Sequence, residues 1–244
     1  MLNRLTAARL LWPSLAALIA LAVLVGLGAW QLQRKAWKEA IIARIATRAT
    51  APPVDLVGLL TATHAEPDLE YTHVSVRGRY LHDKERYLYA PQQSGLGWQV
   101  LTPLATPAGV VVWVNRGSVP DARRAPETRK EGQVDGLVTV TGLLREPRAG
   151  AFTPGNDADR NIWYWADVGG LTASALAAGT TVLPVVVEAD ASQTPPGGLP
   201  KGGVTRLIIP NRHLEYAVTW FGLALTLVGV FVVFARGRLR GDAA

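Results

Sequence analysis

Two long stretches without a charged residue stand near the ends of the chain, at residues 10–30 and 216–235. Each is long enough to cross roughly 30 Å of hydrocarbon as a helix. Between them lies a stretch of ordinary polarity, rich in proline and glycine, whose length suits a single domain. The pattern predicts a hairpin of two transmembrane helices that carries one domain outside the membrane.

A second pattern follows the first apolar stretch, where apolar residues from Leu32 to Ile45 recur every three or four positions. This spacing predicts a helical extension over residues 31–50 that ends before Pro52. From Tyr71 onward, apolar and polar residues alternate instead, as is typical of strands. Seven such segments lie at residues 73–81, 85–91, 97–104, 109–117, 137–146, 161–168 and 181–189.

No helix of crossover length divides most of these segments, which favours antiparallel pairing. Residues 51–215 are therefore expected to form a mainly antiparallel β domain, a small barrel or sandwich, with a short helix at residues 171–178. Residues 115–117 predict a turn at a strand end, with Gly117 in a backbone conformation that other residues avoid. The tryptophans of the WYW triplet at residues 163–165 are expected in the core.

The charges beside the apolar stretches favour one orientation in the membrane. Arginines in the short tails, residues 1–9 and 236–244, predict that both tails are cytoplasmic. Basic residues after the first span favour the opposite orientation, but a long domain is translocated largely regardless of its charge. We therefore expect residues 51–215 to be periplasmic.

The start of the chain bears on the compartment. The first span begins within ten residues of Met1, which leaves no room for a transit peptide and indicates the inner membrane of a bacterium. A cleaved signal peptide is the alternative, because Arg4 and Arg9 form a basic start. The length of the apolar stretch and the helix-forming residues after it favour an uncleaved anchor.

Composition and motifs narrow the function. The net charge of +6 comes mainly from residues where the chain meets lipid headgroups, which indicates membrane contact rather than nucleic-acid binding. Cysteine is absent and Met1 is the only methionine, which excludes disulfides, thiol catalysis and sulfur ligation of copper. The sequence has no HExxH, GxSxG, phosphate-binding or CxxCH motif, so an enzyme is not expected.

Four segments in order along the chain carry a family resemblance. They are LGAWQLQRKAWK (27–38), the stretch from VRGRY to WVNRGSVP (76–120), FTPGNDADRNIWYWAD (152–167) and NRHLEYAVTWFGLA (211–224). Together with the two flanking spans, they resemble the Surfeit locus protein 1 family, also called the Shy family. The sequence departs from the family pattern at Arg212, where asparagine is frequent, and at Ser118, where tryptophan is frequent.

The resemblance implies a non-enzymatic assembly factor for cytochrome c oxidase. By similarity to bacterial members, it implies transient binding of haem a and delivery to the nascent catalytic subunit, with haem a synthase as a further partner. It implies that His213 is the axial ligand of the haem iron. Neutral imidazole is a standard ligand of this kind, and a site at the water–lipid boundary lets the propionates reach water.

Several neighbours of His213 are candidates for the same site. On a helix, Tyr216 or Ala217, and then Trp220, lie on the face of His213. Two antiparallel spans also bring Trp30 to the same boundary. Arg34, Arg206 and Arg212 are candidate partners of the propionates, because guanidinium matches carboxylate geometry. The alternative is an ordinary interfacial belt, in which the aromatic residues anchor the helices and the arginines reach lipid phosphates. Trp30, Gln31, Arg34 and Trp37 fit this belt at the exit of the first span, and they could also complete the groove of the cofactor.

Two other functions remain open from the sequence. One is a membrane-anchored scaffold that binds oxidase subunits without haem. The other is a periplasmic hydrolase anchored in the membrane. A copper carrier is disfavoured, because Cu(I) sites prefer the sulfur ligands that this chain lacks.

Overall fold

The computed structural model of the chain describes residues 2–62, 68–91, 97–205 and 211–241. It divides the chain into two compact units, one of Met1–Arg44 with Ile208–Ala244 and the other of Ile45–Leu207. The helices are α1 (Leu2–Thr50), α2 (Leu56–Ala62), α3 (Val168–Ala175) and α4 (His213–Gly241). The strands are β1 (Val54–Asp55), β2 (His73–Tyr80), β3 (Arg86–Tyr89), β4 (Gly97–Ala105), β5 (Val111–Pro120), β6 (Val138–Arg145) and β7 (Val182–Ala189).

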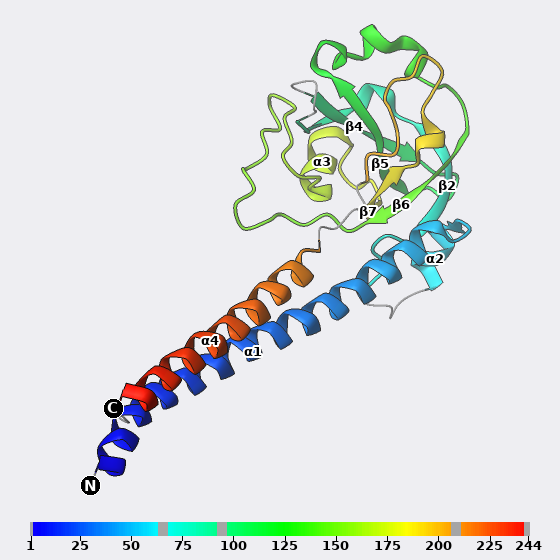
Figure 1. The fold of residues 1–244 in the computed structure, drawn as a ribbon. Coiled ribbons are helices and arrows are strands. Elements are labelled where there is room, and N and C mark those ends of the chain that lie inside the picture. Colours follow the sequence, from blue (N-terminus) through cyan, green and yellow to red (C-terminus); the bar gives the residue numbers. More distant parts are fainter. Residues whose placement is uncertain (1, 63–67, 92–96, 206–210, 242–244) are drawn as a thin grey trace. The chain divides into compact units, whose positions relative to one another are not determined.

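The first unit is a hairpin of two long helices (Figure 1). Segments Leu10–Thr50 and His213–Arg240 are both long and apolar enough to cross a membrane. Helix α1 continues without a break to Thr50, directly before the proline pair that cannot extend it. These helices indicate membrane association.

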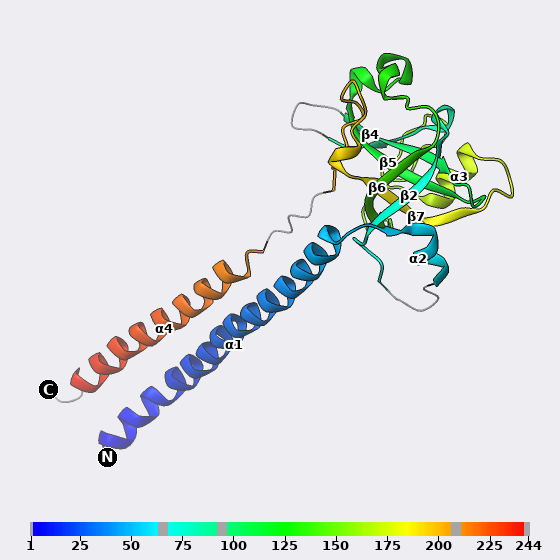
Figure 2. The ribbon, with the colours of Figure 1, turned by 90° about the vertical axis from the view of Figure 1, so that its right-hand side faces the viewer.

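The second unit is a β domain (Figure 2). Its strands are paired in the order β1-β2-β6-β7-β5-β4-β3. An additional pairing of β2 with β4, through Arg79–Ala105 and Tyr80–Leu104, closes β2, β6, β7, β5 and β4 into a barrel. Only the β1–β2 and β5–β7 pairs are parallel among the strands that the structure describes. The predicted small, mainly antiparallel barrel with a short helix is confirmed.

The core follows from the alternation along these strands. Alternate residues of β5, Val112 and Val114, are fully buried in one apolar cluster together with Val76 of β2 and Val187 of β7. The intervening Trp113 faces the opposite way, into a second cluster with Leu171 of α3. One face of β5 thus lines the interior of the barrel, and Trp113 on its other face packs against α3.

Two local predictions were wrong. Residues 161–168 form no strand: Asn161 adopts a left-handed conformation (φ 55°), and the segment makes only two isolated bridges, from Ile162 to Asp157 and from Trp163 to Leu88 of β3. Trp163 is nevertheless a core residue, 1% exposed, whereas Trp165 is only half-buried.

Residues 115–117 lie inside β5 rather than in a turn at its end. Gln99 pairs with Ser118 and Leu101 with Asn115, so two residues of β5 oppose one residue of β4 in a β-bulge. Gly117 adopts a positive φ of 118° in this bulge. The bulge aims the side chain of the preceding residue, Arg116, into the interior, where it is 4% exposed.

Candidate functional site

The two long helices pack along a stripe of small and half-buried residues. On α4, Ala217 and Ala224 are 1% and 5% exposed, and His213 and Trp220 lie half-buried on the same stripe. On α1, Gly28 is buried, and a Cβ there would lie 2.7 Å from the ring of Phe221. Small residues at three- and four-residue spacing allow two helix backbones to approach closely.

His213 is the first residue of α4 and contacts α1 through its ring. The Nδ1 atom of His213 lies 2.7 Å from Oε1 of Gln31, a half-buried residue one turn beyond Gly28. Asn211 lies just before the helix, and its Oδ1 accepts a hydrogen bond from the backbone N–H of His213 at 3.5 Å. Two contacts therefore fix the position of this histidine at the open end of the hairpin.

The other predicted site residues are distributed around both helices. Trp220 shares the stripe of His213, but Tyr216 is 56% exposed and Trp30 is 51% exposed. Arg34 is exposed and places its guanidinium 4.4 Å from the centre of the Trp37 ring. Arg212 is exposed, directly before α4. Arg206, the remaining candidate, lies outside the described residues.

Gln31 was not among the residues predicted to contact the haem iron or the propionates. The sequence placed it in the interfacial belt, from which it could also complete the groove of the cofactor. Its spacing after Leu24 and Gly28 places it on the stripe that faces the second span, and this spacing was the available signal. The structure brings Gln31 and His213 together although they are 182 positions apart.

The β domain contains a separate group of buried charges. Glu85 is 4% exposed and lies between Arg129 and Arg116, which are 5% and 4% exposed. Burial alone would raise the pKa of Glu85, but the His82 ring, the Arg129 guanidinium and the charge of Arg116 lower it to about 2. Glu85 thus stays ionised and serves to neutralise buried guanidinium groups.

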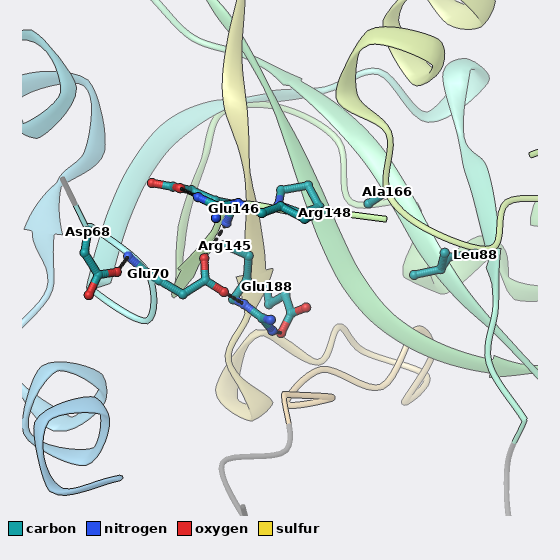
Figure 3. A pocket seen from close by; sticks show the side chains of 9 residues that line it. Asp68, Glu70, Leu88, Arg145, Glu146, Arg148, Ala166 and Glu188 are labelled. Carbon is teal, nitrogen blue, oxygen red and sulfur yellow. Dashed lines mark hydrogen bonds and ion pairs between the residues drawn. The ribbon is translucent and has the colours of Figure 1, made fainter. Parts of the chain in front are cut away.

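A polar cavity of about 610 Å³ lies beside the end of β6 (Figure 3). Arg145 reaches between two carboxylates there, with Nε 2.6 Å from Glu70 and Nη1 3.1 Å from Glu188. Burial would lower the pKa of Arg145, but Glu188 and Glu70 raise it. The single guanidinium of Arg145 thus lies between two carboxylates, which leaves an excess of negative charge at the centre of this cavity.

The β domain also offers few side chains that could ligate a metal ion together. Among the described residues, no three histidine, aspartate or glutamate side chains gather in a way that could hold a metal ion. A single imidazole that ligates the iron of a macrocycle needs no such group, because the porphyrin supplies the other ligands. His213 is the candidate ligand that the family resemblance implies.

Comparisons with known proteins extend over both units. The model of the SURF1 family matches residues 18–225. A SURF1-like protein of Monosiga brevicollis is 37% identical over 228 residues, covering 88% of this chain and 84% of that protein. Surfeit locus protein 1 of Homo sapiens is 39% identical over 236 residues, covering 87% of this chain and 74% of that protein. A SURF1-like protein of Drosophila melanogaster is 34% identical over 218 residues, covering 82% of this chain and 69% of that protein. The chain therefore belongs to the SURF1 family.

Proposed function

We propose that this chain is a non-enzymatic assembly factor for cytochrome c oxidase that binds haem a through His213 and delivers it to the nascent catalytic subunit. The observation that carries the proposal is the state of the His213 ring. Its Nδ1 atom is engaged by Gln31, and Nε2 has no hydrogen-bond partner among the residues that the structure describes. A ring held in this way offers one nitrogen to an iron atom.

The surroundings of His213 fit a haem. Apolar side chains such as Leu214 and Phe221 are 51% and 37% exposed on α4 and supply a surface for the macrocycle. Arg34 and Arg212 are exposed cations near the same end of the hairpin, and guanidinium groups bind carboxylates such as haem propionates. Bound haem a would supply a redox-active iron that this chain holds without altering.

Delivery requires that the chain can also release its cargo. The sequence contains no cysteine, so no thioether bond to the porphyrin can form. One imidazole–iron bond and non-covalent contacts give a reversible attachment. His213 holds the cargo, and the basic residues orient its propionates toward water.

We propose the bacterial inner membrane as the location, with the β domain in the periplasm and with haem a synthase as the donor. The absence of cysteine allows a direct test of this orientation. A cysteine introduced at the fully exposed Phe152, which is 99% exposed, is expected to react with a membrane-impermeant maleimide from the periplasmic side. A cysteine at position 4 is expected to react only after the inner membrane is opened.

The central experiment is an absorption spectrum of the protein purified from cells that make haem a. Wild-type protein is expected to carry the pigment, and His213→Ala is expected to lose it together with mature oxidase. Thr219→Ala changes an exposed residue of the same helix and is the matched control. If His213→Ala loses no pigment, the proposal fails; loss of pigment with intact oxidase assembly would instead favour a scaffold that acts without haem.

A further inference from the structure

We propose that Gln31 is a positioning residue that fixes the tautomer of His213 and presents Nε2 to the haem iron. This inference rests on the proposed function. It concerns a contact between two helices that are far apart in the sequence, and nothing in the family comparison assigns it. In this arrangement α4 supplies the ligand, and α1 supplies the side chain that orients it.

The tautomer follows from the chemistry of the two side chains. The Oε1 atom of Gln31 is an amide oxygen, which accepts hydrogen bonds but does not donate them. At 2.7 Å from this oxygen, Nδ1 of His213 must carry the hydrogen. A neutral imidazole has one N–H group, so the lone pair that binds a metal is then on Nε2. The opposite tautomer would set the lone pair of Nδ1 against the amide oxygen.

The contact also limits rotation of the ring. Gln31 is half-buried on the stripe between the helices, one turn from the place where Gly28 meets Phe221. A ring attached at Nδ1 to one helix and at its Cβ to the other has little freedom to turn. Nε2 therefore points in a defined direction before any cargo arrives, which reduces the entropy lost on binding.

A hydrogen bond of this type changes the ligand electronically as well. An acceptor on the distal N–H of a histidine raises the basicity of the ligating nitrogen, and a carboxylate does so more strongly than an amide. Gln31→Glu is therefore expected to bind haem a and to shift its reduction potential to more negative values. Gln31→Leu removes the acceptor and is expected to weaken haem a binding about 10-fold.

The test compares Gln31→Leu, Gln31→Glu and wild type in detergent micelles. Gln33→Leu is the matched control, because Gln33 is an exposed glutamine on the same helix. Titration with haem a gives the affinity, and spectroelectrochemistry gives the potential. A direct readout needs no haem: the ¹⁵N shifts of the His213 ring at about pH 8.5, above the ordinary imidazole range, report which nitrogen carries the hydrogen.

The inference predicts an Nδ1–H ring in wild type and Gln33→Leu, and a larger Nε2–H population in Gln31→Leu. It is overturned if Gln31→Leu keeps the wild-type tautomer and affinity, or if the potentials of Gln31→Glu and Gln33→Leu are the same. A purely structural role for Gln31 would not shift the potential of Gln31→Glu. If His213→Ala itself keeps the haem, the proposed function fails; if His213→Ala loses it while the Gln31 variants behave like wild type, only this inference fails.

Discussion

Glu85 and Arg129 form an ion pair whose side chains are each only 2% exposed. The carboxylate of Glu85 also lies 3.5 Å from Arg116, so a single anion is shared by two cations away from water. Removing one member of such a group is costly, because the remaining charges lose their partner but not their burial. This relationship gives the clearest stability prediction for the β domain.

Glu85→Gln is expected to lower the free energy of unfolding by about 3–5 kcal/mol, since it leaves two buried guanidinium groups without a carboxylate. Urea unfolding of the full chain in detergent micelles measures the change. The control is Glu127→Gln at an exposed position, for which a change within about 0.5 kcal/mol is expected. Equal stability of the two variants would contradict the assignment.

The same carboxylate makes the stability of the folded protein depend on pH in the acidic range. The pKa of Glu85 is lowered from the ordinary 4.5 to about 2 in the folded protein, so its stabilising contribution is present above pH 4.5 and is lost as the pH falls toward 2. Unfolding measured across this window is expected to show a loss of stability in wild type. Glu85→Gln is expected to show a shallower dependence on pH.

His73 makes the stability of the folded protein depend on pH with the opposite sign. Its Nδ1 atom lies 2.8 Å from the carbonyl oxygen of Ala51, and its Nε2 atom lies 2.9 Å from Asp190. Both partners are acceptors, so the ring satisfies them only as imidazolium. Burial would lower the pKa of His73, but the hydrogen bond and charge of Asp190 and the Ala51 carbonyl raise it above 6.5.

The contribution of His73 is therefore complete below about pH 6.5 and is lost as the pH rises through its raised pKa. His73→Ala is expected to reduce stability more at about pH 6 than at about pH 9, because the contribution of the charged ring declines as the pH rises through the raised pKa. Unfolding curves at the two values provide the measurement. Asp190→Asn removes the charged partner and is expected to flatten the same slope; an unchanged slope would count against this account.

Several features of the fold could be predicted from the sequence because they depend on local periodicity. The alternation in β5 buries Val112 and Val114 and turns Trp113 outward, as a strand with two covered faces requires. Residues 161–168 show the limit of such reasoning: their aromatic residues favour a strand, but a single left-handed residue, Asn161, prevents a ladder.

The buried charges had no comparable signal, and for the hairpin contact the spacing of Gln31 after Gly28 gave the helix face but not the partner. Glu85 and Arg129 are 44 positions apart, and either residue alone resembles an ordinary surface charge. His213 was identified through the family resemblance, whereas its partner Gln31 depended on how the two helices pack. Long-range pairs of polar residues carry no period in the sequence, so only the assembled structure brings them together.

Gly28 sets the distance between the two helices. Gly28→Leu places a side chain where the ring of Phe221 lies and is expected to separate the helices by about 1–2 Å, within the range that contact side chains impose on helix pairs. Spin labels on cysteines introduced at the exposed positions 33 and 214 measure the distance in this cysteine-free chain. Gly26→Leu is the control, because a Cβ there meets nothing within 4 Å.

Gly117 is expected to tolerate no side chain. In Gly117→Ala, the left-handed backbone and an overlap with the carbonyl oxygen of Lys201 act together, so we expect a loss of more than about 3 kcal/mol. Gly109→Ala isolates the first effect, because Gly109 has a φ of 78° but open space around it, and should cost about 1–2 kcal/mol. Thermal unfolding of both variants separates strain from overlap; similar losses would show that the bulge can relax.

The pairings between neighbouring strands of the barrel differ in length. The seam between β2 and β4 is held by Arg79–Ala105 and Tyr80–Leu104, whereas β4 and β5 are paired from Gly97 to Ala105. Local opening is expected to begin at the pairing of β2 with β4, because the fewest backbone hydrogen bonds must break there. A barrel opened there would expose the backbone groups of Arg79 and Tyr80 on β2 and of Leu104 and Ala105 on β4, and unpaired strand edges are surfaces through which chains aggregate. The domain therefore most needs protection from aggregation after its synthesis and before β2 pairs with β4.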